Sequence, residues 1–187
     1  MSARQRCPAS LRVGTILYSA FFDTSEDTGK ATGTIYEEVV RSIRRRRNSS
    51  PDSPKFVNVT KKIVGLTWVD TTKPPATRYG KKPPKPPKTE GWASYISPMC
   101  QTNFVLGADL PHGICTTKLL AIKSAISDLQ NDIEWYDREI AEHKKTLIPD
   151  AEHLAELVRE KNDVEKSLRL AKSYLTKERN KRVTGKK

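Results

Sequence analysis

A run of lysines and prolines near the middle of the chain has the most distinctive spacing for chemistry. Lys82, Lys85 and Lys88 are separated by pairs of prolines. A polyproline II helix turns once every three residues, so these lysines would share one edge at intervals of roughly 9 Å. Such a row of charge suits the phosphates of a nucleic acid, and Arg78 and Lys81 would extend it. The repeat also fits the aromatic groove of SH3-type domains, and its simplest structural role is a rigid, soluble spacer.

A second basic cluster follows a predicted strand and precedes a polar loop. It consists of Arg44, Arg45, Arg46 and Arg47. Guanidinium groups pair well with phosphates, although charge runs are often only solvated faces. Two basic clusters on one small unit favour a polyanionic partner. Among the nearby aromatic residues, Tyr79 is the best candidate for stacking on a base, whereas core packing suits Trp68 and Trp92 better.

Cys100, His112 and Cys115 raise the question of a metal site. The last two have ligand-like spacing, but the fourth ligand of a tetrahedral zinc site would have to be Cys7 or Asp109. Buried free thiols are the simpler explanation, so we predict neither a metal nor a cofactor. Three cysteines without close spacing fit a reduced compartment, which would be the cytoplasm or, in a eukaryote, the nucleus or an organelle.

Common catalytic and nucleotide-binding motifs are absent from the sequence. It contains no G-x-x-x-x-G-K-[ST], G-x-G-x-x-G, H-E-x-x-H or G-x-S-x-G pattern. We therefore expect a protein that is not an enzyme.

The overall charge supports a polyanionic partner. The 187 residues carry a net charge of +12, with 36% hydrophobic and 30% charged residues. This excess favours nucleic acid or an acidic surface and argues against mimicry of DNA. The apolar run at residues 13–22 is too short to span a bilayer, so no membrane association is expected.

Residues 116–183 show the clearest structural pattern, with apolar residues at alternating steps of three and four. Such spacing is typical of a helix that packs along a partner helix. Pro149 separates two such series, and the short connection predicts an antiparallel hairpin roughly 45 Å long. Thr116 or Thr117 would cap its first helix. The seam residues are Leu119, Ile122, Ile126, Leu129, Ile133, Tyr136, Ile140 and Leu147, then Leu154, Leu157, Val164, Leu168, Ala171 and Leu175.

The preceding residues predict a small antiparallel β unit, which makes the fold class α+β with a coiled-coil-like helical hairpin. β-Branched and aromatic residues indicate strands at 13–23, 34–43, 55–69 and 92–96. A short helix competes at 34–43, and 55–69 would form two strands or one bent at Gly65. Residues 101–110 are predicted to be irregular, with Phe104 reaching the core.

These elements predict four parts of the chain. A flexible arm (1–12) precedes the basic β-rich unit (13–115), which contains a Pro/Lys-rich loop (71–90). The hairpin (116–183) follows, and the last part is a basic tail (184–187).

The leading functional hypothesis is a non-enzymatic nucleic-acid-binding protein that contacts the phosphate backbone through its basic β unit. The hairpin would dock another protein or join copies of the chain into a homo-oligomer. One alternative is a protein–protein adaptor or inhibitor, for example one encoded by a mobile element, that acts on an acidic target. Another is a structural component of a ribonucleoprotein assembly.

Overall fold

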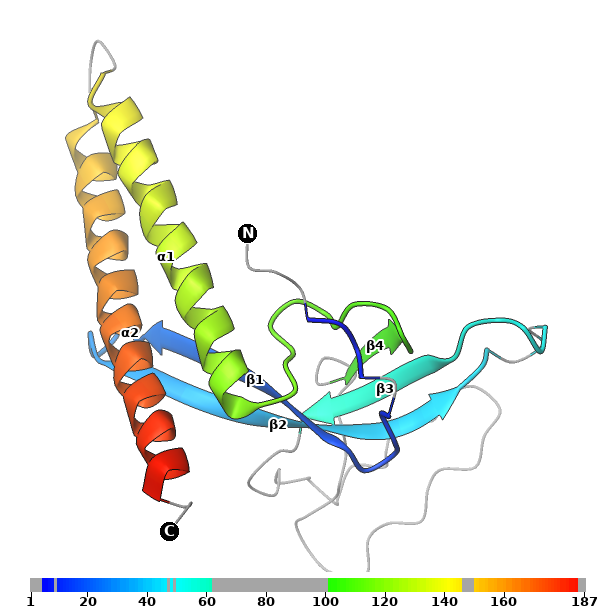
Figure 1. The fold of residues 1–187 in the computed structure, drawn as a ribbon. Helices are drawn as coiled ribbons and strands as arrows, with labels where there is room; N and C mark the ends of the chain where they lie inside the picture. Colours follow the sequence, from blue (N-terminus) through cyan, green and yellow to red (C-terminus); the bar gives the residue numbers. More distant parts are fainter. Residues whose placement is uncertain are drawn as a thin grey trace, which may run out of the picture.

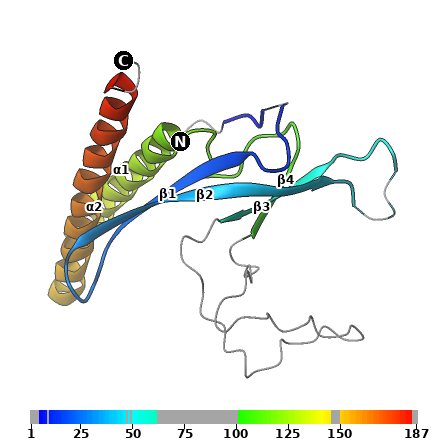
Figure 2. The ribbon, with the colours of Figure 1, turned by 90° about the horizontal axis from the view of Figure 1, so that it is seen from below.

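The chain forms a four-stranded antiparallel sheet followed by two long helices (Figure 1, Figure 2). The computed structural model describes residues 5–8, 10–46, 48, 50–61, 101–145 and 150–184. The predicted α+β fold class is confirmed. Its elements, in chain order, are β1 (Ile16–Thr24), β2 (Ala31–Arg44), β3 (Phe56–Lys61), β4 (Gln101–Val105), α1 (Lys118–His143) and α2 (Ala151–Thr184).

The strands lie in the order β1-β2-β3-β4, and each is antiparallel to its neighbour. β2 is a strand, not the competing short helix. Residues 101–105 form β4, so the prediction of irregular structure is wrong there, because pairing with β3 supplies order that the local sequence does not specify. Phe104 is buried, as predicted. Residues 62–69 of the third predicted strand, and the predicted strand at 92–96, lie outside the described residues.

A β-bulge changes which side chains of β2 face the core. Val40 pairs with Val59, but the next pair is Ser42 with Asn58, so Arg41 is an extra residue. Since side chains alternate along a strand, this insertion lets both Val40 and Ile43 face the core while Ser42 faces away from it. After the bulge, the polar side chains of Ser42 and Arg44 therefore lie on the face of the sheet opposite the core of Val40, Val57 and Val59.

The core on one side of the sheet is completed by segments from outside the strands. Val40, Val57 and Val59 are fully buried there, and Cys7 and Leu11 from the N-terminal segment pack against the same core. The Cys7 amide donates to the Ala108 carbonyl at 2.9 Å. In its described part, the N-terminal segment thus differs from the flexible arm expected for residues 1–12. The same side is covered further by Leu110 and Ile114, from the connection between β4 and α1.

The two helices pack against the opposite end of the sheet from the β2–β3 connection (Figure 1, Figure 2). Phe22 of β1 lies with Ile122 of α1 and Ala171 of α2 in a second apolar cluster. The ring of Phe22 meets that of Tyr174 edge to face, with centroids 5.3 Å apart. Burying a side chain such as Ile122, which is completely inaccessible, is worth about 1.5–3 kcal/mol.

The helical hairpin has the predicted antiparallel arrangement. Thr117 is the N-cap of α1, and its hydroxyl accepts from the Leu120 amide at 3.3 Å. Lys161 interrupts the apolar seam, but its ammonium group lies 2.6 Å from Asp137 of the other helix. No helix within the described residues has the length and apolarity needed to cross a membrane.

Gly33 is required for the contact between sheet and helices. A Cβ atom at this position would lie 2.5 Å from the ring of Phe22, and the Gly33 carbonyl accepts from the Tyr174 hydroxyl at 3.3 Å. We expect Gly33→Ala to displace Phe22 and to lower the free energy of unfolding by about 1–3 kcal/mol in urea denaturation. The exposed Thr34→Ala should change it by no more than about 0.5 kcal/mol. Equal effects of the two substitutions would contradict this packing.

Candidate nucleic-acid interface

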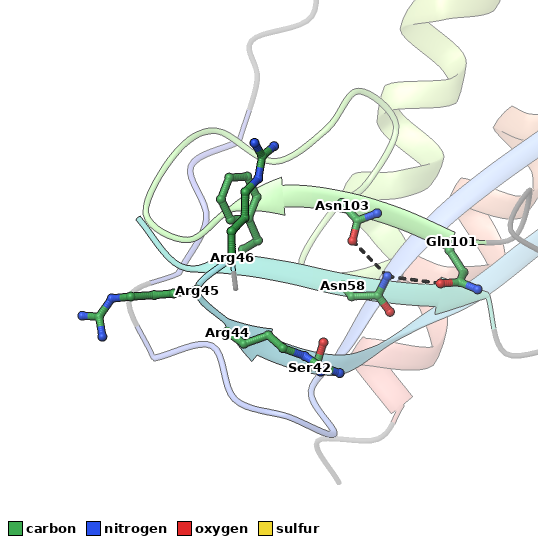
Figure 3. A pocket seen from close by; sticks show the side chains of 8 residues that line it. Ser42, Arg44, Arg45, Arg46, Asn58, Gln101 and Asn103 are labelled. Carbon is green, nitrogen blue, oxygen red and sulfur yellow. Dashed lines mark hydrogen bonds between the residues drawn. The ribbon is translucent and has the colours of Figure 1, made fainter. Parts of the chain in front are cut away.

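Three of the four consecutive arginines lie where β2 ends, at the end of the sheet away from the helices (Figure 3). Arg44 is the last residue of β2 and pairs with Phe56 of β3. Arg45 donates through Nε to the Ser53 carbonyl at 3.1 Å, so it is held by the β2–β3 connection. The guanidinium carbon of Arg46 lies 4.6 Å from the centre of the Phe56 ring. This cation–π contact fixes one arginine over an aromatic ring.

Amide side chains form the neighbouring part of the same surface. Asn58 of β3 donates through Nδ2 to Oε1 of Gln101 at 3.3 Å and to Oδ1 of Asn103 at 3.0 Å, both in β4. Asn58 also pairs with Ser42 of β2, so three strands contribute to one polar row. The amides therefore orient one another before any ligand is present.

These residues surround an open depression of about 530 Å³ that crosses β2, β3 and β4 (Figure 3). Because β3 side chains alternate, the depression lies on the face opposite the buried Val57 and Val59. We call it the basic sheet face. Its described lining contains three arginines and no carboxylate: Ser42, Arg44, Arg45, Arg46, Phe56, Asn58, Gln101 and Asn103.

Arg41, the extra residue of the bulge, adds a further positive charge beside this face. It donates through Nε to the Thr60 hydroxyl at 2.8 Å. Thr60 pairs with Gln101, and it lies on the same side of β3 as Phe56 and Asn58. The bulge thus directs a fourth guanidinium group toward the edge of the depression.

The chemistry of this face suits a nucleic acid with accessible bases. Arginine forks pair with phosphate oxygens, and a ring beneath a guanidinium group can stack on a base. Asparagine and glutamine amides carry both donors and acceptors, which matches base edges. Phosphate contacts, stacking and base-edge contacts are therefore available within one depression.

Sequence reasoning found only part of this site. Arg44, Arg45 and Arg46 were predicted, whereas Phe56, Asn58 and both β4 amides were missed. The alternation Phe56-Val57-Asn58-Val59 indicated that Phe56 and Asn58 share a face, but the partner strand β4 was not predicted. The other predicted contact residues lie outside the described residues: Arg47, Arg78, Tyr79, Lys81, Lys82, Lys85 and Lys88.

The residues considered for a metal have other roles in the fold. Nε2 of His112 lies 3.1 Å from Oδ2 of Asp128. Cys115 forms a backbone bridge with Tyr18, in which each amide donates to the other carbonyl at 2.8 Å. Cys100 lies outside the described residues, within which no group of three or more His, Cys, Asp or Glu could hold an ion.

Similarity to known proteins gives no guide to this surface. The sequence matches no protein-family model, and comparisons with curated proteins and with solved structures find no similar protein. The function must therefore be argued from the site itself.

A buried carboxyl group lies on the opposite side of β2 from Arg44. Glu38 is 2% exposed; Oε1 accepts from the Ser19 hydroxyl at 2.8 Å, and Oε2 has no hydrogen-bond partner among the described residues. Burial raises the pKa of Glu38, although the hydrogen bond from Ser19 and the charge of Lys61 oppose the rise. The folded protein thus keeps this proton at pH values where the unfolded chain has released it.

Glu38 should therefore make the protein less stable as pH rises from the ordinary carboxyl pKa through its raised value. Glu38→Gln keeps the shape without the charge, so its free energy of unfolding should exceed that of the wild type by a margin that grows with pH. Urea denaturation across pH 4 to 8 measures this margin, with the exposed Glu134→Gln as the control. If the stability difference between Glu38→Gln and the wild type stays constant or shrinks as pH rises, the buried Glu38 does not destabilise the protein when it is charged, and the prediction is wrong.

Proposed function

We propose that this protein is a non-enzymatic, single-stranded nucleic-acid-binding protein, and that the basic sheet face is its contact surface. The observation that carries the proposal is the meeting of three arginines, a guanidinium-capped ring and an amide network in one carboxylate-free depression. In a protein of net charge +12, this surface would attract phosphates over a long range.

Single strands fit this surface better than duplexes. Phe56 is half-buried beneath Arg46. A base can stack on the Arg46–Phe56 pair only if it is not already stacked between its neighbours in a duplex. The open shape of the depression also suits an extended strand whose phosphates run past Arg44 and Arg45. On this proposal, the row of lysines at 82, 85 and 88 would extend the phosphate contacts along the strand.

Binding should be measured by fluorescence anisotropy with labelled single strands of about 15 nucleotides and the matching duplex. We expect tighter binding to the single strand, with log K falling by roughly 0.7 per phosphate contact for each unit of log salt. Arg44→Gln/Arg45→Gln/Arg46→Gln should weaken binding by roughly 100-fold near 0.1 M salt and reduce the slope by about two. The loss follows because three phosphate contacts disappear.

The matched control removes the same charge from the helices, with Arg138→Gln/Arg169→Gln/Arg179→Gln, and should change the affinity much less. All three of these arginines are exposed. Binding that is absent at low salt, insensitive to salt, or equally weakened by both triple variants would refute the proposal. A separate variant, Phe56→Leu, tests stacking: it keeps an apolar side chain and should weaken binding to single strands by about fivefold or more.

A second candidate function is that of an adaptor that docks another protein on the hairpin. Trp135 and Val158 favour it, because their side chains are 45% and 40% exposed on the two helices. A paired Trp135→Ser/Val158→Ser variant would lose a protein partner captured from native cells even after nuclease treatment. Loss of all partners on nuclease treatment of the wild type would instead support nucleic-acid binding or a ribonucleoprotein role.

A further inference from the structure

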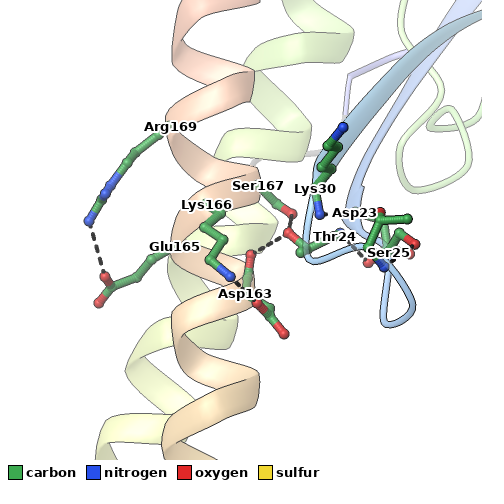
Figure 4. Close-up of polar contacts among 10 residues, drawn as sticks. Asp23, Thr24, Ser25, Lys30, Asp163, Glu165, Lys166, Ser167 and Arg169 are labelled. Carbon is green, nitrogen blue, oxygen red and sulfur yellow. Dashed lines mark hydrogen bonds and ion pairs between the residues drawn. The ribbon is translucent and has the colours of Figure 1, made fainter.

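A cleft of about 500 Å³ lies where the β1–β2 turn meets the side of the helical hairpin. Its walls come from the end of β1 and from both helices. The Thr24 hydroxyl contacts the Asp163 carbonyl at 2.8 Å and the Ser167 hydroxyl at 2.9 Å, and both Thr24 and Ser167 are buried (Figure 4). The strand is thus tied to α2 beside the cleft, which fixes the walls relative to each other.

The cleft offers apolar surface that the fold leaves only partly covered. Phe21 is 59% exposed at its edge, although its neighbour Phe22 is buried under the helices. Leu129 of α1 and Val164 of α2 line the same space and are only partly buried. An apolar rim and floor of this kind can bury the aliphatic side chains of a ligand.

The charge of the cleft is opposite to that of the whole protein. Among the described residues, its lining has five carboxylates and a single cation, Arg159, and Asp163 is also paired with Lys166 at 2.7 Å. In the sequence, positions 129–163 hold ten Asp/Glu and five Lys/Arg, a net charge of −5 in a chain of net charge +12.

Two titratable groups of the cleft have raised pKa values. Burial, and to a lesser extent Asp128, raises the pKa of Asp132, while burial and then Glu160 raise the pKa of Tyr136. Burial is the main cause of both shifts, and nearby carboxylates add to them. A positively charged ligand would relieve the repulsion from these carboxylates.

We propose that the hairpin cleft docks a short segment of a partner protein in which lysines or arginines alternate with aliphatic residues. The cations would pair with Asp132 and Glu160, and the aliphatic groups would cover Phe21, Leu129 and Val164. The volume of the cleft suits a few side chains of an extended peptide. Nucleic acid has the wrong charge for this cleft, so the inference is independent of the proposed function and would survive its failure.

If the basic sheet face binds nucleic acid and the cleft binds a basic peptide, the chain would link a polyanion to a basic protein. Figure 1 and Figure 2 place the helices and the β2–β3 connection at opposite ends of the sheet. Each ligand would therefore bind without blocking the other.

Selection of random dodecapeptides displayed on phage, against the nuclease-treated full chain, tests the proposal. We expect the enriched peptides to alternate basic and aliphatic residues. Labelled synthetic versions should bind the protein in fluorescence anisotropy, and added salt should weaken this binding. Asp132→Lys/Glu160→Lys should reduce this affinity at least tenfold, and Phe21→Ser should do the same without any change in charge. Excess single-stranded nucleic acid should leave peptide binding unchanged.

The matched controls reverse the charge of two glutamates, or remove an apolar side chain, at positions outside the cleft. Glu134→Lys/Glu142→Lys changes the net charge of the protein by the same amount. Val13→Ser removes another exposed apolar side chain, which is 63% exposed. Neither control should alter peptide affinity. The absence of enrichment, enrichment of neutral or acidic peptides, or equal losses in the controls would overturn the proposal. So would self-association of the chain that the cleft variants abolish, because the occupant would then be a second copy.

Discussion

The β-bulge at Arg41 is the constraint on which the arrangement of this protein depends. Before the bulge, β2 pairs with β1 and Ile35 packs toward the helices. β2 pairs with β3 on both sides of the bulge, and after it Ile43 packs against the other core. A strand without the extra residue would keep strict alternation, and Ser42 and Arg44 would then face the same side as Val40. The bulge instead turns these polar side chains to the open face, where Phe56, Asn58 and the β4 amides meet them.

The same strand joins two cores that lie on opposite faces of the sheet. The helices cover one face near the β1–β2 turn, while the N-terminal segment and the β4–α1 connection cover the other face near β3 and β4. Each end of the sheet therefore has one covered face and one accessible side. The basic depression lies on the accessible face near β3 and β4, whereas the acidic cleft lies beside the helices at the β1–β2 turn, so the two opposite charges are at opposite ends of the sheet.

Features governed by local sequence could be predicted, and features governed by long-range pairing could not. The hairpin followed from apolar spacing over two long segments, with Pro149 between them and Thr117 at its start. β4 was missed because Gln101-Thr102-Asn103 carries no apolar pattern, and its order comes from β3. The site was therefore predicted only as far as its arginines, since its amides depend on that pairing.

The bulge is also hard to read from sequence alone. Val40 and Ile43 are three residues apart, which breaks strict alternation and fits one turn of a helix equally well. Val39, which is also apolar, hides the position at which the strand changes side. Buried polar contacts, such as those of Thr24 with α2, join residues far apart in sequence and leave no local signal. Packing against the helices decides these contacts, so only the folded chain reveals them.

The most direct test of this account is a map of backbone amide chemical-shift changes as a single-stranded oligonucleotide is added to the ¹⁵N-labelled protein. The account predicts that the largest changes occur at Ser42, Arg44, Phe56, Asn58 and Asn103, and that Asp132 and Glu160 change little. Changes concentrated on the hairpin, or none along β2, β3 and β4, would contradict the claim that the bulge builds a nucleic-acid-binding face.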